Sequence, residues 1–249
     1  MFINNKSLVG LGDITPRKEM KNTALLRILE NAAGIHSEIA GYGITDMNKT
    51  RRSWVIINWK IEVLSRPLIN DKLNVKTWIR MVDKYHSFRD FQVTNQYNDI
   101  VAIGTTKWIF IDIDKEKLTQ IPQEVSNQYQ PELGFSIFKC KDESEEIDKL
   151  REPENLEVLN ESKVKITRSM IDINKHLHNV FYLDIAKETF PEEIAFANEF
   201  NNFEIMYKKE IKYGETVTGN YYYDEENKYH IVVIKDEENK NLHAILRFK

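Results

Sequence analysis

The apolar residues near the start of the chain recur at helical spacing. Between residues 23 and 40 they fall on every third or fourth position, which places them on one side of a helix: Ala24, Leu25, Ile28, Leu29, Ala32, Ile35 and Ile39. The segment ends before Gly41 and Gly43, which favour a turn. The pattern predicts a long amphipathic helix from Thr23 to about Ala40.

After this helix the pattern changes to long runs rich in β-branched and aromatic residues, which are typical of strands. Asn98 and Asp99 separate the last two runs with a turn. The runs are residues 53–64, 73–82, 87–97 and 100–112. Together they predict one antiparallel sheet, and a helix followed by a curved sheet is compatible with the hotdog arrangement.

From residue 122 to 162 the periodic pattern is lost. Residues 141–157 are crowded with acids and include Pro153, as is typical of a solvated connector. The plan then repeats with an extended run, a helix that Pro191 stops, and four further strands. The predicted ranges are 163–173 for the run, 180–190 for the helix, and 203–211, 216–223, 229–235 and 242–248 for the strands.

Asn22 and Asn179 stand at corresponding places before the two predicted helices, and asparagine is a good N-cap. The halves share this layout but few identities, so the repeat is one of architecture. The prediction is an α+β chain of two tandem hotdog folds, a double hotdog. It consists of an N-terminal hotdog at 1–130, an acidic connector at 131–160 and a C-terminal hotdog at 161–249.

Composition excludes several classes of function. A net charge of -4 and a pI near 5.9 give no global basic field for nucleic acid or an anionic membrane, and no run approaches the length of a membrane span. The single cysteine, Cys140, excludes a disulfide framework and suits a reducing compartment. With no apolar signal core at the start, we expect a cytoplasmic protein. No phosphate loop, dinucleotide fingerprint or metal motif is present, so no cofactor or metal is expected.

The most unusual segment runs from Met170 to Asn179. If it is an extended strand, alternate side chains share a face, so Asp172, Asn174 and His176 continue the apolar face of Val164, Ile166 and Met170. A polar trio is costly to bury without partners, and therefore lies in a hydrogen-bonded site or at a wet strand end. The helix after it offers the N–H groups of Asn179 and Val180, suited to a carbonyl oxygen that gains negative charge.

The alternative interpretation is purely structural. In it Asp172 and Asn174 form turns, Asn179 only caps the helix, and His176 makes an ordinary polar contact. The corresponding positions of the first half lack the polar set, since they hold Thr15, Arg17 and Glu19. At most one half is therefore expected to be catalytic.

One segment resembles a motif of the acyl-acyl carrier protein thioesterases of bacteria and plant plastids. Here it reads Asp172-Ile173-Asn174-Lys175-His176-Leu177-His178-Asn179-Val180-Phe181-Tyr182. In that family the similar motif is Asp-Val-Asn-Gln-His-Val-Asn-Asn-Val-Lys-Tyr. Tyr207-Lys208-Lys209-Glu210 resembles the Tyr-Arg-Arg-Glu of that family. Further matches, in the right order over nearly the whole chain, are Trp54-Val55, Trp108-Ile109-Phe110 and Ile121-Pro122-Gln123-Glu124-Val125.

The resemblance implies hydrolysis of fatty acyl-acyl carrier protein (acyl-ACP) without a cofactor. It also implies an active-site set of Asp172, Asn174, His176 and Glu210. Glu210 would activate water, Asn174 and His176 would position water and thioester, and Asp172 would hold Asn174. Whether His176 or Glu210 takes the proton stays open. The family often has cysteine after this glutamate; here Ile211 excludes that nucleophile.

The resemblance also implies an acyl-binding half and a carrier partner. The first half would bind the acyl chain, with Met20, Trp54, Ile57 and Trp59 as candidates that can equally be core. Because acyl carrier proteins are acidic, a local basic surface is expected. It would be formed by Lys208, Lys209 and Lys212, or by Arg51 and Arg52. Two hotdog halves in one chain allow a monomer or a homodimer.

Three competing functions remain open at this point. They are an acyl-CoA thioesterase, a hotdog dehydratase that acts on hydroxyacyl thioesters, and a double-hotdog protein that binds acyl groups without turnover. Free-thiol release separates hydrolysis from dehydration, since a dehydratase keeps the thioester. Replacing Asn174 and His176 by alanine separates catalysis from binding.

Overall fold

The computed structural model describes residues 1–138, 147, 149–197 and 199–249. By its internal contacts the chain divides into two compact units, Met1–Asp148 (unit 1) and Lys149–Lys249 (unit 2). Cys140 and part of the predicted connector at 131–160 lie outside the described residues. Each unit is therefore considered by itself.

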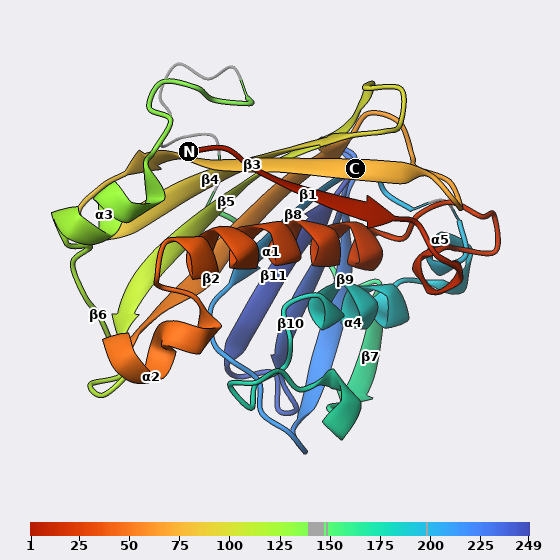
Figure 1. The fold of residues 1–249 in the computed structure, drawn as a ribbon. Helices are drawn as coiled ribbons and strands as arrows, with labels where there is room; N and C mark the ends of the chain where they lie inside the picture. Colours follow the sequence, from red (N-terminus) through yellow and green to blue (C-terminus); the bar gives the residue numbers. More distant parts are fainter. Residues whose placement is uncertain (139–146, 148, 198) are drawn as a thin grey trace. The chain divides into compact units, whose positions relative to one another are not determined.

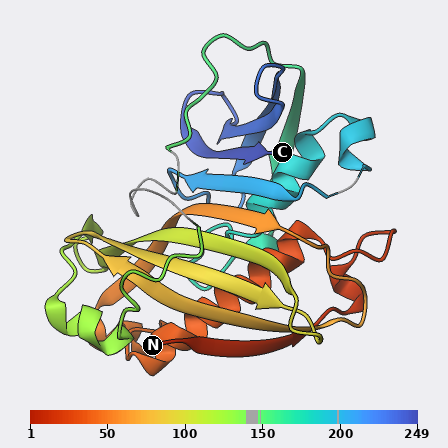
Figure 2. The ribbon, with the colours of Figure 1, turned by 90° about the horizontal axis from the view of Figure 1, so that it is seen from above.

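In unit 1 a long helix lies across an antiparallel sheet (Figure 1), as the sequence predicts. The helix is α1 (Asn22–Ile39), and the strands are β1 (Ile3–Leu8), β2 (Arg52–Val63), β3 (Lys72–Val82), β4 (His86–Thr94) and β5 (Ile100–Asp112). Their order is β1-β3-β4-β5-β2, with β6 (Lys117–Leu118) paired to β5. Figure 2 shows these strands side by side. Two shorter helices, α2 (Met47–Thr50) and α3 (Gln123–Tyr129), complete the unit within its described part.

Unit 2 repeats the plan with a shorter helix. Its strands are β7 (Asn160–Lys165), β8 (Asn202–Tyr207), β9 (Thr216–Asp224), β10 (Tyr229–Asp236) and β11 (Leu242–Phe248), in the antiparallel order β8-β11-β10-β9-β7. The helices are α4 (Phe181–Thr189), followed by the single turn α5 (Glu192–Ala195). Pro191 ends α4 as predicted.

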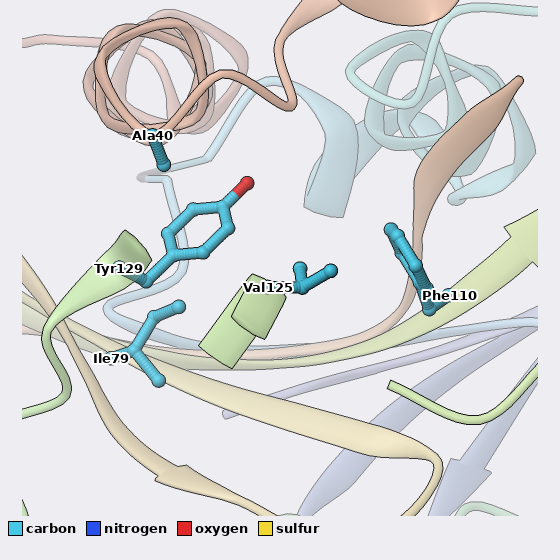
Figure 3. Packing of buried hydrophobic residues seen from close by; sticks show 5 residues of the cluster. All are labelled: Ala40, Ile79, Phe110, Val125 and Tyr129. Carbon is cyan, nitrogen blue, oxygen red and sulfur yellow. The ribbon is translucent and has the colours of Figure 1, made fainter. Parts of the chain in front are cut away.

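Alternation along the strands supplies the core of unit 1. Trp59 on β2 and Phe91 on β4 are fully buried, and their rings lie 5.3 Å apart, while Leu25 and Leu29 of α1 are also buried. At one end α3 adds Val125 and Tyr129 to a cluster that includes Ala40, Ile79 and Phe110 (Figure 3). The sequence pattern did not predict α3, because its short apolar stripe lies in a polar region.

The prediction that Asn22 and Asn179 cap the two helices is wrong. Asn22 is the first residue of α1 and is buried, and its Oδ1 accepts a hydrogen bond from Arg66 Nη1 at 2.6 Å. Val180, not Asn179, occupies the N-cap of α4, where no side-chain cap forms. Each asparagine thus lies at the start of a helix without acting as its N-cap.

Gly219 on β9 permits α4 to approach the sheet. A Cβ atom at this position would lie 2.1 Å from Oγ1 of Thr189. Thr189 is fully buried and its hydroxyl donates to the carbonyl oxygen of Ile185, so it cannot move away freely. We expect Gly219→Ala to reduce the free energy of unfolding by about 1–3 kcal/mol.

Urea denaturation followed by circular dichroism measures this loss. Gly34→Ala serves as the control, because a Cβ atom there meets nothing within 4 Å and glycine within a helix is unfavourable. Combining Gly219→Ala with Thr189→Ala should recover part of the loss. Equal stability of Gly219→Ala and the wild type would contradict the close packing of α4 on β9.

Candidate active site

Residues 172–176 form a tight reversal, and not the extended strand that the sequence pattern predicted. The N–H of Asp172 donates to the carbonyl of His176 at 2.8 Å, and the N–H of Lys175 donates to the carbonyl of Asp172 at 3.1 Å. Lys175 adopts a left-handed conformation with φ of 65°. β7 ends at Lys165, so alternation along a strand does not place Asp172, Asn174 and His176 on one face.

The Asp172 carboxylate holds this reversal together. Its Oδ1 accepts the backbone N–H groups of Asn174 at 2.8 Å and His176 at 3.1 Å, and its Oδ2 accepts Nδ2 of Asn174 at 3.3 Å. Aspartate commonly stabilises turns by such hydrogen bonds to the following backbone. One part of the structural alternative, the turn formed by Asp172, is therefore confirmed, whereas its Asn179 cap is not. The same turn keeps the three polar side chains together.

A second segment, residues 208–212 after β8, lies beside this loop. The N–H of Leu177 donates to the carbonyl of Ile211 at 2.8 Å, and His176 and Lys212 form a β-bridge. Glu210 lies in this segment with its side chain exposed, whereas Ile211 is fully buried. The backbone thus brings Glu210 close in the fold to the loop that carries Asp172, Asn174 and His176.

His243 on β11 fixes the start of the Glu210 segment. Its carbonyl accepts the N–H groups of Lys208 at 2.8 Å and Lys209 at 3.3 Å, and its Nδ1 lies 3.2 Å from the carbonyl oxygen of Lys209. His243 is itself buried. The sequence pattern did not single it out, because a lone histidine in a strand carries no local signal.

Two tyrosines connect the loop, the Glu210 segment and the start of α4. Tyr182 is buried, and its pKa is raised first by burial and then by the negative charges of Glu210, Asp172 and Glu215. Its ring packs edge-on against Tyr207 at 4.9 Å, and the Tyr207 hydroxyl donates to the carbonyl of Asn179 at 3.1 Å. Both tyrosines belong to the matched motifs, and neither was predicted as a site residue.

The start of α4 supplies backbone donors next to the loop. The N–H of Phe181 donates to the carbonyl of His178 at 3.0 Å, but the N–H groups of Asn179 and Val180 donate to no other described residue. Unpaired N–H groups at a helix start favour an oxygen that carries negative charge. A carbonyl oxygen of an ester or thioester has this chemistry when water attacks it.

Unit 1 contains the same loop backbone with other side chains. The N–H of Thr15 donates to the carbonyl of Glu19 at 2.8 Å, and Lys18 has φ of 66°. The N–H of Met20 donates to the carbonyl of Pro67 at 2.8 Å, as Leu177 does to Ile211 in unit 2. The absence of the polar set in the first half is therefore a difference of side chains on one shared backbone.

The other candidates in unit 1 differ in exposure and in ion pairing. Met20 and Trp59 are fully buried, whereas Trp54 and Ile57 are partly exposed. For the basic candidates, Arg51 Nε donates to Asp114 at 3.1 Å and Arg52 Nη1 lies 3.0 Å from Asp112 Oδ2.

The lysines of unit 2 are different. Lys208, Lys209 and Lys212 are exposed and form no ion pair with another described residue. Within the described part of the chain no group of three or more metal-binding side chains occurs. No described helix has the length and apolar character needed to cross a membrane.

Comparison with known families matches both units. The model of the acyl-ACP thioesterase N-terminal domain matches residues 3–129, and that of the acyl-ACP thioesterase C-terminal domain matches residues 153–248. The oleoyl-acyl carrier protein thioesterase of Coriandrum sativum is 24% identical over 226 residues, which cover 85% of the chain. The palmitoyl-acyl carrier protein thioesterase of Gossypium hirsutum is 27% identical over 181 residues, or 72% of the chain. These alignments span 60% and 43% of the respective relatives.

Solved structures confirm the predicted double-hotdog fold. The 12:0-ACP thioesterase of Umbellularia californica superposes with a TM-score of 0.84 at 19% identity, covering 100% of this chain and 96% of the other. An acyl-ACP thioesterase of Bacteroides thetaiotaomicron superposes with a TM-score of 0.80 at 20% identity, covering 99% and 96%. At these identities the likeness establishes the fold and not the chemistry.

Proposed function

The chain belongs to the acyl-ACP thioesterase family, and on that premise we propose that it hydrolyses the thioester of fatty acyl-ACP to a free fatty acid and the carrier thiol. One observation of the site carries the proposal: the loop with Asp172, Asn174 and His176 lies beside the segment with Glu210. A protein that only binds acyl groups has no need of this combination of polar side chains.

In the proposed mechanism a water molecule attacks the thioester carbon while a base removes its proton. Glu210 is the proposed base, and Asn174 and His176 position the water and the thioester. Asp172 fixes Asn174 through the contacts described above. The proton then passes to the departing thiolate, so no cofactor is required. The variants at Glu210 and His176 decide which of these two residues carries the proton from the water to the thiolate.

The tetrahedral intermediate places negative charge on the former carbonyl oxygen. The N–H groups of Asn179 and Val180 are the proposed donors to that oxygen, supported by the positive end of the α4 dipole. Ile211 follows Glu210, so the mechanism uses no cysteine at that place. Attack by water without a covalent enzyme intermediate is the simplest course.

The proposed division of labour assigns the acyl chain to unit 1, with Met20, Trp54, Ile57 and Trp59 as candidate contacts. For the acidic carrier protein we favour Lys208, Lys209 and Lys212, because Arg51 and Arg52 already pair with aspartates. The protein would act as a monomer or a homodimer in the cytoplasm. The single cysteine supports a reducing compartment.

The deciding experiment follows free-thiol release from a panel of ACP and CoA thioesters of several chain lengths. We expect turnover of ACP thioesters, and a loss of about 10²-fold or more in His176→Ala, since groups that handle protons contribute at least that much. Glu19→Ala is the matched control, because Glu19 occupies the equivalent position in the unit 1 loop.

Each competing function gives another result. Preference for CoA thioesters would indicate an acyl-CoA thioesterase. Loss of water from a hydroxyacyl thioester without thiol release would indicate a dehydratase. Binding without turnover, unchanged in His176→Ala, would indicate an acyl-binding protein and would contradict the proposed hydrolysis.

A further inference from the structure

The helix that covers the sheet is only half as long in unit 2 as in unit 1 (Figure 1). α1 has 18 residues and α4 has 9, which correspond to lengths of about 27 Å and about 14 Å. β9 also has 9 residues, but an extended strand of that size is about 30 Å long. α4 is therefore too short to cover the whole face of the sheet.

The part of this face that α4 does not cover begins where the helix ends. Gly219 of β9 lies against Thr189, the last residue of α4. Side chains alternate along a strand, so Tyr221 and Tyr223 lie on the same face as Gly219 but beyond the end of the helix. His230 of β10 is the register partner of Tyr223 and shares this face. The sheet thus presents two tyrosines and a histidine where α4 does not reach.

A pocket lies over these three rings. Its volume is about 460 Å³, within the range of about 300–1,000 Å³ that is typical of small-molecule sites. Tyr221, Tyr223 and His230 line it from the sheet, and Glu193 and Ile194 line it from α5. The candidate active site lies before the start of α4, whereas this pocket lies after its end. The proposed hydrolysis therefore makes no use of it.

The aromatic rings of the pocket are fixed and uncharged. The Tyr221 hydroxyl lies 2.9 Å from Nδ1 of His230, and the Phe200 ring packs against the His230 ring at 4.8 Å. Burial, and then Tyr223 and Glu193, raise the pKa of Tyr221 to about 12, whereas burial lowers the pKa of His230. Near pH 7 the tyrosine and the histidine are therefore both neutral.

The charges around the pocket are negative. Of the residues that line it in the described part of unit 2, Glu193 alone is charged, and its carboxylate forms no ion pair with another described residue. The pocket also adjoins the negative end of the α4 dipole, since Pro191, two residues after that end, lines it. The faces of the tyrosine rings carry partial negative charge. All three features favour a cation over an anion such as a fatty acid.

We propose that this pocket binds a small organic cation whose ammonium nitrogen carries alkyl groups. Such a group combines a positive charge, which Glu193 and the end of α4 attract, with an apolar surface that packs on the rings of Tyr221 and Tyr223. The site would be a second one, separate from thioester hydrolysis.

The test compares choline with 3,3-dimethylbutan-1-ol, which has the same shape but a carbon atom in place of the charged nitrogen. A proton NMR titration that follows the ring signals of His230 gives a dissociation constant for each compound. We expect choline to bind about tenfold more tightly, in line with the usual strength of cation–π contacts. Glu193→Gln should weaken choline binding several-fold and leave binding of the alcohol unchanged.

Glu192→Gln is the matched control, because Glu192 is exposed and lies in the same helical turn but does not line the pocket. We expect it to bind choline as the wild type does. Tyr223→Leu is the second variant. It keeps an apolar side chain but removes an aromatic face, and should abolish most of the preference for choline.

Three results would overturn the proposal. They are equal affinity of the wild type for both compounds, no change of the His230 signals with either compound, and equal weakening of choline binding in Glu192→Gln and Glu193→Gln. Because the titration needs no turnover, its outcome is independent of the proposed hydrolysis. Thiol release by Glu193→Gln should equal that of the wild type.

Discussion

Replacing Glu210 by glutamine is expected to lower kcat for acyl-ACP hydrolysis by about 10²–10⁴-fold, the usual contribution of a general base. Glutamine keeps the size of the side chain and its ability to hydrogen-bond, but it cannot take a proton from water. Because Glu210 is exposed, the substitution should leave stability unchanged. Thiol release under saturating substrate measures kcat directly.

Glu215→Gln provides a matched control for the loss of a negative charge. Glu215 also raises the pKa of Tyr182, but its carboxylate accepts the N–H of Lys212, a structural contact that glutamine can preserve. We expect this variant to remain within a few-fold of the wild type. If both carboxylates acted only through their electrostatic field, kcat would instead fall equally in Glu210→Gln and Glu215→Gln.

The same measurement decides which residue accepts the proton. If Glu210→Gln remains nearly active while His176→Ala is inactive, His176 is the base and Glu210 has a positioning role. Full activity in both variants would contradict the proposed site altogether.

Asp90→Ala is expected to reduce the stability of unit 1 by about 3–5 kcal/mol, the usual cost of leaving one member of a buried ion pair alone. Asp90 and Arg80 are 0% and 1% exposed, and Nε of Arg80 donates to Oδ1 of Asp90. The other oxygen accepts the N–H of Ile137 at 2.8 Å. The substitution therefore removes both the partner of a buried charge and an anchor for the segment after α3.

Tryptophan fluorescence during urea denaturation isolates this effect, since all four tryptophans lie in unit 1. Asp114→Ala is the control, because the Asp114–Arg51 pair is exposed and such pairs contribute little to stability. A double variant, Arg80→Met with Asp90→Leu, should regain much of the loss. If Asp90→Ala lowers the free energy of unfolding only slightly and the double variant is as stable as the wild type, the buried pair contributes little to stability.

The fold followed from periodicity wherever an element buries one face. The long apolar stripe of α1 and the β-branched runs of β2 to β5 gave elements within one residue of those found, except that the run predicted to end at residue 97 ends at Thr94. Shorter elements were missed, among them α3 and the edge strand β1. They form because Tyr129 and Ile3 pack against residues of unit 1 that are distant in the sequence. Such contacts leave no signal in the local pattern of apolar and polar residues.

The resemblance to a known family located the candidate site, whereas periodicity predicted its local backbone structure wrongly. Alternation predicted a strand at residues 163–173, whereas Asp172 closes a turn through its own carboxylate. Turn chemistry, recognised as the alternative, was the better guide. The position of Glu210 beside the loop depends on hydrogen bonds across the sheet, notably those of His243, and no short-range signal predicts them.

The two matching loops bear on how such a chain acquired its present form. The same turn, with the same left-handed lysine and the same hydrogen bonds, carries Thr15 and Glu19 in unit 1 but Asp172 and His176 in unit 2. When the same backbone is present twice, one copy can retain the polar set of side chains while the other copy changes its side chains and takes a different role. Duplication of a single ancestral hotdog, followed by divergence of its loops, accounts for one backbone holding two unlike surfaces.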